Sequence, residues 1–327
     1  MKRINDKKTY KIAVVGATGL VGRMMIKVLE GFNIRAKFYL FASSRSAGKK
    51  LPVNGKDRKV LELNKKNVIR VRPDFALFSA GGAVSREWVP VFASGGCVVV
   101  DNSSAFRMEP GVPLIVPEVN GDVISGGLPR RVISNPNCTT IGAVVALKPL
   151  DDAFGIRRVV FSTYQAMSGA GVRAVNLYRA QDRLHFNNLI PQIDEFVSNG
   201  NTKEEEKMIH ETWKILGRED IAVSATCVRV PIENCHSISV NVQFERAVTA
   251  EEVRAVLERA PGVIVMDEPH EKKYPMPVVV DNRNEVFVGR IRGDGSAENC
   301  VNLFLVLDNI RKGAATNAVQ ILKLLIK

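Results

Sequence analysis

The sequence predicts an α/β protein in which a doubly wound parallel sheet is followed by an α+β domain with a mixed, largely antiparallel sheet. Up to residue 137, short apolar strand patterns alternate with amphipathic helical patterns, as in a Rossmann-type sheet. A glycine-rich turn joins the first strand to the first helix. Beyond residue 138, long stretches alternate apolar and polar residues, which indicates a more antiparallel sheet.

The elements follow from these patterns in chain order. Residues 10–42 predict a strand, a helix and a second strand, and two further apolar strands flank a short helical stretch in residues 74–104. Four later segments predict long strands: residues 157–167, 223–232, 236–244 and 285–294. Two others predict helices, residues 203–217 and residues 250–260, the latter with Thr249 as a candidate cap. A last strand and helix, 300–326, return to the first domain.

Two domains are therefore expected, residues 1–137 with 309–327 and residues 138–308. The chain carries 46 Lys and Arg against 34 Asp and Glu, a net charge of +12. These basic residues are scattered, so a small anionic ligand is favoured over nucleic acid or a membrane surface. With no signal-peptide pattern and no stretch of 18 apolar residues, a cytoplasmic protein is expected.

The five cysteines lack the C-x-x-C spacing of a zinc site and form no disulfide framework. Free thiols and no bound metal are expected. The cysteines are Cys97, Cys138, Cys227, Cys235 and Cys300.

The turn GATGLVG places Gly16, Gly19 and Gly22 between a strand and a helix. Backbone N–H groups at such a turn can hold a pyrophosphate, so the pattern favours dinucleotide binding over a purely structural turn. The second strand is followed by Ser44 and Arg45, with no acidic residue to bind a ribose 2′-hydroxyl. An arginine there favours NADP over NAD, although a solvated polar loop stays open as an alternative.

Cys138 lies in SNPNCTT, between a strand and a helix expected to begin at Thr139 or Thr140. A helix N-terminus favours a thiolate, so Cys138 is either a nucleophile or a cysteine that only packs. His236 opens a later strand and could serve as its base only through folding.

Four charged residues could hold an acidic substrate together, although each taken alone is better explained as a solvated charge or a local ion pair. Glu211 and Lys214 share one helix face, and the others are Arg107 and Arg229.

Nine ordered motifs run through nearly the whole chain: GATGLVG, SSRSAGK, DNSSAFRM, VPEVN, SNPNCTT, YQAMSGAG, ETWKIL, RVP and DNIRKGAATNAVQI. With these motifs the chain closely resembles the aspartate-semialdehyde dehydrogenase family. The resemblance implies NADPH-dependent reductive dephosphorylation of L-4-aspartyl phosphate to L-aspartate 4-semialdehyde, in the biosynthesis of lysine (through diaminopimelate), threonine and methionine. It also implies a homodimer, formed through the second, catalytic domain.

The resemblance implies that Cys138 carries the aspartyl group as a thioester, with His236 as acid/base and Gln165 orienting substrate and nucleophile. Arg229 would bind the substrate carboxylate and Glu211 its amino group. The phosphate would lie against three residues: Arg107, Asn137 and Lys214. The cofactor contacts implied are Gly16, Thr18, Gly19, Leu20, Val21, Ser44, Arg45, Ser168, Gly169 and Asn309.

Three other functions fit parts of the sequence. An N-acetyl-glutamyl-phosphate reductase uses the same thioester chemistry, but its substrate has no free ammonium group to pair with Glu211. An inactive relative acting as a dimeric binding protein would be expected to lose Cys138 or His236, and both are present. Nucleic-acid binding would rest on the net charge alone.

Overall fold

The computed structural model describes residues 9–32 and 34–326, in two compact units. The first is built from the chain up to Pro136 and from Ala314 onward, and the second is Asn137–Gly313. The first unit was expected to include residues up to 137, and in the structure its first segment ends at residue 136. The chain was expected to return to this unit at residue 309, but it returns at residue 314, so residues 309–313 belong to the second unit. That the two units act as separate cofactor and catalytic domains stays a prediction.

A seven-stranded sheet forms the first unit, in the order β3-β4-β2-β1-β5-β6-β7. Its strands are β1 (Tyr10–Val15), β2 (Ala36–Ala42), β3 (Lys50–Val53), β4 (Lys56–Glu62), β5 (Phe75–Phe78), β6 (Val98–Asp101) and β7 (Val132–Ser134). All neighbours pair in parallel except the β3–β4 hairpin. The Rossmann-type prediction is confirmed. The hairpin was not predicted, because β4 reads KDRKVLE, a largely charged sequence without a clear apolar face.

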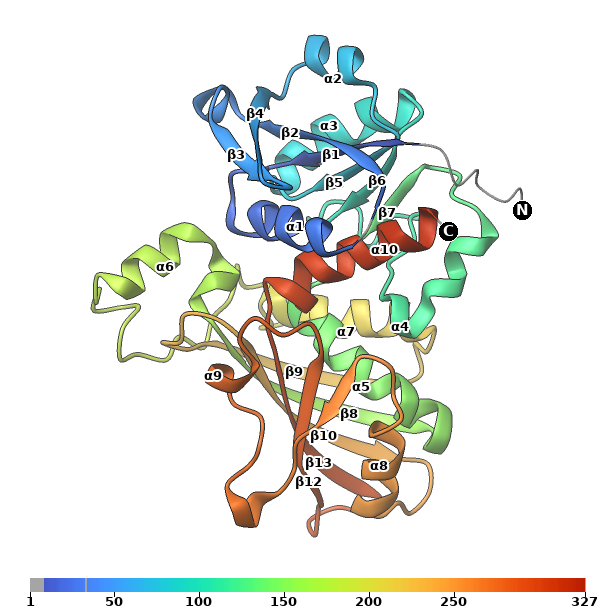
Figure 1. Ribbon diagram of the computed structural model, residues 1–327. Coiled ribbons are helices and arrows are strands. Elements are labelled where there is room, and N and C mark those ends of the chain that lie inside the picture. Colours follow the sequence, from blue (N-terminus) through green and yellow to red (C-terminus); the bar gives the residue numbers. More distant parts are fainter. Residues whose placement is uncertain (1–8, 33, 327) are drawn as a thin grey trace. The chain divides into compact units, whose positions relative to one another are not determined.

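Helices cover both faces of this sheet. They are α1 (Leu20–Gly31), α2 (Lys65–Val71), α3 (Gly82–Ser94), α4 (Pro117–Asn120) and α10 (Thr316–Ile326), with 3-10 turns η1 (Ser44–Ser46) and η2 (Gly121–Gly126). Figure 1 shows α1 and α10 side by side. The return of α10 to the first unit confirms the prediction for the C-terminal helix.

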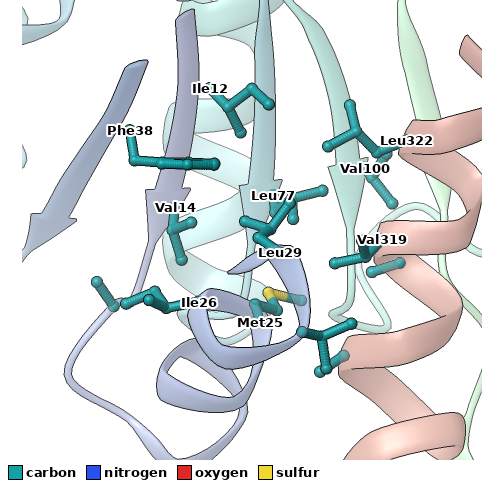
Figure 2. Close-up of a cluster of buried hydrophobic side chains, with 14 of the residues drawn as sticks. Ile12, Val14, Met25, Ile26, Leu29, Phe38, Leu77, Val100, Val319 and Leu322 are labelled. Carbon is teal, nitrogen blue, oxygen red and sulfur yellow. The ribbon is translucent and has the colours of Figure 1, made fainter. Parts of the chain in front are cut away.

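Strand alternation explains why both faces are covered. Ile12 and Val14 of β1 pack in the cluster that contains α1 and α10, shown in Figure 2. The intervening Ala13 and Val15 pack with α2 and α3 on the other face. A strand buried on both faces needs a continuous apolar sequence, which is what YKIAVV provides.

The second unit contains a six-stranded sheet in the order β11-β12-β13-β10-β8-β9. Its strands are β8 (Ile156–Gln165), β9 (Ala222–Arg229), β10 (His236–Phe244), β11 (Val263–Val265), β12 (Val286–Gly293) and β13 (Cys300–Leu307). The pairs β8–β9 and β11–β12 are parallel, and the other three pairs are antiparallel. The mixed, largely antiparallel sheet predicted for this region is confirmed.

The helices of this unit are α5 (Cys138–Phe154), α6 (Val172–Arg179), α7 (Lys203–Leu216), α8 (Ala250–Leu257) and α9 (Pro277–Val280). Shorter turns are η3 (Met167–Ala170) and η4 (Pro269–Glu271), and the π-helical η5 (Arg311–Ala315) contains the limit between the second unit and the first. The predicted α7 and α8 are confirmed, and Thr249 caps α8 in a capping box with Glu252. One expectation was wrong: α5 begins at Cys138 itself, because Asn137 caps it.

None of the helices within residues 9–32 and 34–326 is long and apolar enough to cross a bilayer. The five cysteines are all free, as expected.

The close packing of the first βα turn gives a direct test of the fold. A Cβ added to Gly22 in α1 would lie 2.2 Å from the carbonyl oxygen of Gly16, whereas one added to Gly31 at the end of the same helix meets nothing within 4 Å. Gly22→Ala is therefore expected to lower the free energy of unfolding by about 1–3 kcal/mol. Denaturant unfolding measures it.

Gly31→Ala is the matched control and is expected to be neutral or to stabilise by up to about 1 kcal/mol. Equal stability of the two variants would contradict the packing described for the turn.

Candidate active site

Cys138 and His236 meet at the start of α5 and the start of β10. Their Sγ and Nε2 atoms lie 3.2 Å apart, within hydrogen-bond distance for sulfur. Asn137 precedes the cysteine, and its side-chain Oδ1 accepts the N–H groups of Thr139 and Thr140. Because Cys138 is the first residue of the helix, its sulfur lies at the positive end of the helix dipole, which favours a thiolate.

The other ring nitrogen of His236 accepts a hydrogen bond from the backbone N–H of Ala166, with N and Nδ1 3.0 Å apart. A backbone amide can only donate, so Nδ1 carries no hydrogen and the neutral ring carries its hydrogen on Nε2, toward the sulfur. Burial, and then the positive charge of Arg229, lower the pKa of His236 well below 6.5. The ring is therefore a neutral Nε2–H donor to Cys138.

Arg229 ends β9 and lies against the backbone of the same residue, Ala166. Its Nη1 donates to the carbonyl oxygen of Ala166 at 2.6 Å, and burial lowers the pKa of the guanidinium. Gly169 also lies against both side chains, since a Cβ there would be 2.9 Å from Cε1 of His236 and 3.0 Å from Nη1 of Arg229. A bare Cα at this position therefore leaves room for the two side chains.

Helix α7 contributes buried carboxylates. Oε2 of Glu211 accepts the backbone N–H of Asn137 at 2.6 Å. Oε1 of Glu204 accepts from Nδ2 of Asn137 at 2.8 Å and from Nε2 of Gln165 at 3.2 Å. Lys214, one turn beyond Glu211, is half-buried on the same helix. Glu204 was not predicted as a site residue.

A periodic signal in the sequence could have found Glu204. Buried positions of α7 recur at Glu204, Met208, Glu211 and Ile215, which is the spacing of one helix face. Because Glu211 was already a candidate, a second acid two turns earlier on that face was a candidate too.

The expected cofactor residues of the second unit form a polar network beside His236. Nδ2 of Asn309 donates to Oγ of Ser168 at 3.0 Å, and its Oδ1 accepts the N–H of Cys235 at 3.0 Å. Ser168 donates in turn to Oδ1 of Asn234 at 2.9 Å. The loop that carries Ser168 and Gly169 is thereby tied to the segment leading into β10.

One cluster has the spacing of metal ligands. Ligand atoms of Cys235, Asp281 and Asp308 lie within 4.8 Å of one another. Asp308, however, already accepts three backbone N–H groups, and burial raises its pKa, which disfavours the charged form that a cation requires. The cluster is better explained as an anchor for its loops.

The first unit carries the glycine turn and the residues expected around it. Gly16 has φ +83°, and a Cβ there would lie 2.1 Å from the carbonyl oxygen of Ser79, which follows β5. The strand order reverses between β1 and β5, the position at which doubly wound sheets bind nucleotides. Gly19 precedes α1, and Leu20 and Val21 form its first turn.

Beside this turn, Oγ1 of Thr18 donates to Oγ of Ser46 in η1 at 3.4 Å. Ser44 and Arg45 are exposed residues of the same short turn. Arg107 is buried in the first unit, where it donates to the backbone oxygens of Asn102 and Asn135, at 3.0 Å each. Cofactor and phosphate contacts by these residues stay predictions.

The tautomer of His236 can be measured directly. Nitrogen NMR of histidine-labelled protein is expected to show one ring protonated at Nε2 alone and unchanged from about pH 7.5 to about pH 5.5, because its pKa is held well below 6.5. In the unfolded chain this histidine takes up a proton below about pH 6.5, whereas in the folded protein it stays neutral. The free energy of unfolding therefore decreases as the pH falls below about 6.5.

His236→Asn identifies the signal by removing it. A ring protonated at Nδ1, or at both nitrogens near neutral pH, would contradict the hydrogen bond from Ala166.

Comparisons with known proteins agree with the fold and identify a family. Residues 11–126 match the family model "Semialdehyde dehydrogenase, NAD binding domain", and residues 147–312 match "Semialdehyde dehydrogenase, dimerisation domain". Aspartate-semialdehyde dehydrogenase of Aquifex aeolicus is 50% identical over 97% of this chain and 98% of its own. The enzyme of that name from Bacillus subtilis is 44% identical over 95% of each chain.

Solved structures of aspartate semialdehyde dehydrogenases are also similar to this chain. Aspartate semialdehyde dehydrogenase II of Vibrio cholerae, complexed with ASA, superposes with a TM-score of 0.92 at 40% identity, covering 98% of this chain and 99% of that one. The Candida albicans enzyme with NADP gives a TM-score of 0.80 at 28% identity, over 97% and 98% of the two chains. With both family models, near-full-length relatives and the glycine turn in agreement, the chain belongs to the aspartate-semialdehyde dehydrogenase family.

Proposed function

We propose that the protein catalyses the NADPH-dependent reductive dephosphorylation of L-4-aspartyl phosphate to L-aspartate 4-semialdehyde and phosphate. The observation that carries the proposal is the 3.2 Å approach of Cys138 Sγ to Nε2 of a buried, neutral His236. Cys138 is also the only one of the five cysteines, all of them described, that is not buried. Burial raises the pKa of Cys227, for example, to about 12, which suppresses its thiolate.

In the proposed reaction, the Cys138 thiolate attacks the acyl-phosphate carbon, the C–O bond to phosphate breaks, and a thioester forms on the sulfur. A nicotinamide bound here would supply the hydride that reduces the thioester carbon. The Nε2–H of His236 donates a hydrogen bond first to the sulfur anion and then to the tetrahedral oxygen as its negative charge develops, and it keeps its proton. The C–S bond breaks as this oxyanion re-forms the C=O bond of the aldehyde, and the sulfur leaves as the thiolate.

The role assigned to His236 differs from the one implied by resemblance. A histidine that takes the thiol proton at Nε2 needs its hydrogen on Nδ1, which would then oppose the N–H of Ala166. We therefore propose that the thiol loses its proton to solvent under the influence of the α5 dipole, and that His236 acts as donor.

The two polar ends of the substrate would be held by groups of opposite charge. The planar guanidinium of Arg229 suits a bidentate contact with the α-carboxylate, and the buried carboxylate of Glu211 suits the ammonium. Arg107 and Lys214 would hold the phosphate. Asn137 uses its side chain for the α5 cap and for Glu204, so its proposed contact with phosphate is as a neighbour rather than as a dedicated ligand.

NADP is the proposed cofactor. Arg45, in η1 directly after β2, suits a 2′-phosphate, and the segment from Ala42 to Gly48 contains no acid that would repel one. The Candida relative is described with NADP. Ser168, Gly169 and Asn309, which surround His236, would face the nicotinamide.

We propose a homodimer formed through one face of the sheet of the second unit. Helices α5 and α8 cover one face, while the other carries partly exposed side chains on neighbouring strands. They are Val160, Ser162, Tyr164, Ser239, Asn241, Asn302 and Phe304. This unit matches the dimerisation model of the family, and a second copy would cover the face.

The product aldehyde would serve the biosynthesis of lysine, through diaminopimelate, and of threonine and methionine. A cytoplasmic location is proposed because five free thiols suit a reducing compartment.

Replacement of the nucleophile tests the mechanism. With L-aspartate semialdehyde, NADP and phosphate supplied, wild-type protein should generate NADPH absorbance, and Cys138→Ala should lower kcat by at least about 10³-fold. The control Cys300→Ala, a buried cysteine of β13, should retain turnover. Full activity of Cys138→Ala would exclude the thioester route, and an inactive wild type would exclude the function.

The proposed preference for NADP over NAD can be tested by replacing Arg45. Charge-assisted hydrogen bonds to a phosphate contribute about 1.5–3 kcal/mol, so Arg45→Ala should raise the KM for NADP about 10–100-fold and change that for NAD little. Steady-state kinetics with both cofactors measures the difference, with Arg70→Ala in α2 as the control. Equal changes for the two cofactors would remove Arg45 from the 2′-phosphate site.

A further inference from the structure

The carboxylate of Glu204 lies inside the second unit, with the residue only 5% exposed. Its Oε1 accepts two side-chain amides, from Asn137 at 2.8 Å and from Gln165 at 3.2 Å. Both amides belong to residues next to reacting groups. Asn137 precedes Cys138, and Gln165 precedes Ala166, whose N–H binds His236. One carboxylate oxygen therefore links the two halves of the site.

The bond from Asn137 determines the orientation of the α5 cap. An asparagine amide can be flipped, and only one orientation presents Oδ1 to the N–H groups of Thr139 and Thr140. The flipped orientation would place Oδ1 against the Glu204 carboxylate and NH₂ against the helix N–H groups. Glu204 thus selects the orientation that caps the helix at Cys138.

The amide of Gln165 is oriented in the same way. Its Nε2 donates to Oε1 of Glu204 and, at 3.4 Å, to Oγ1 of Thr163. The two amide hydrogens are thereby directed to Glu204 and Thr163, so Oε1 of Gln165 is the end turned away from the carboxylate. A glutamine that orients substrate needs a defined donor or acceptor end, and Glu204 defines it.

The negative charge of Glu204 has its own counter-ion. Oε2 accepts from Nζ of Lys207 at 3.1 Å, and Lys207 also pairs with Asp194 at 2.8 Å. Burial lowers the pKa of Lys207, but the two carboxylates outweigh it and the net pKa is raised, so the lysine stays charged. Arg229 is therefore not needed to neutralise Glu204 and keeps its charge for substrate.

We propose that Glu204 is a positioning residue for the thioester reaction, which orients the amides of Gln165 and Asn137 toward the reacting groups. The inference rests on the proposed function. It assigns a role in catalysis to a carboxylate that the proposed reaction does not place against substrate or cofactor.

The test begins with Glu204→Gln, which keeps size and shape but replaces one acceptor oxygen by a donor. In the semialdehyde assay, kcat should fall about 10–100-fold, the usual effect of removing such a supporting partner. The KM for NADP should be unchanged, because the variant leaves the first unit intact, whereas loss of the charge that pairs with Lys207 should lower the Tm. Glu206→Gln, on the same helix but bonded to Asn199, Asn201 and His210, is the matched control and should keep wild-type kcat.

A double-mutant cycle separates positioning from a general structural role. If Glu204 acts through Gln165, Glu204→Gln should cost far less in a Gln165→Ala background than in the wild type. The same fold-loss in both backgrounds, or wild-type kcat for Glu204→Gln, would overturn the proposal.

Glu204→Asp provides a second variant should the glutamine variant fold poorly. It retains the charge and the Lys207 pair but withdraws the carboxylate from the two amides, so kcat should fall here too; full activity would overturn the proposal. An active wild type with unaffected Glu204 variants defeats this inference alone, whereas an inactive wild type defeats the proposed function.

Discussion

The backbone of Ala166 is the constraint on which the site of the second unit depends. Its N–H binds Nδ1 of His236 and its carbonyl oxygen accepts from Arg229. Sheet topology brings these three residues together, because β8 and the parallel β9 end at Gln165 and Arg229, and the antiparallel β10 begins beside them at His236. Two consecutive peptide groups at the end of β8 thus set the tautomer of the histidine and the direction of the guanidinium.

Two helices complete this arrangement. α5 brings Cys138 to the sheet edge, and α7 packs its buried face against the start of α5 and against β9. Glu205 accepts the N–H groups of Thr202 and Cys227, so it joins the start of α7 to β9. The positions of nucleophile, histidine and arginine therefore follow from backbone hydrogen bonds more than from contacts among their own side chains.

Sequence reasoning predicted the elements with strong periodicity and the residues in recognisable motifs. The apolar β1, the glycine turn and the Thr249 cap of α8 are local patterns, and the chain follows them. Glu204 was missed because KEEEK presents three similar glutamates, and it is distinguished only when its spacing from Glu211 is used to place both on one helix face. The tautomer of His236 could not be predicted from the sequence, since it depends on a backbone amide 70 residues away in the chain.

Helix α7 carries three acidic residues, Glu204, Glu205 and Glu211, that are at most 8% exposed. Each of them accepts a backbone or side-chain N–H group, so an apolar replacement would leave a buried donor without its acceptor. The carboxylates that hold the site together therefore also stabilise the packing of the helix. Design aimed at heat resistance should leave this face of α7 unchanged.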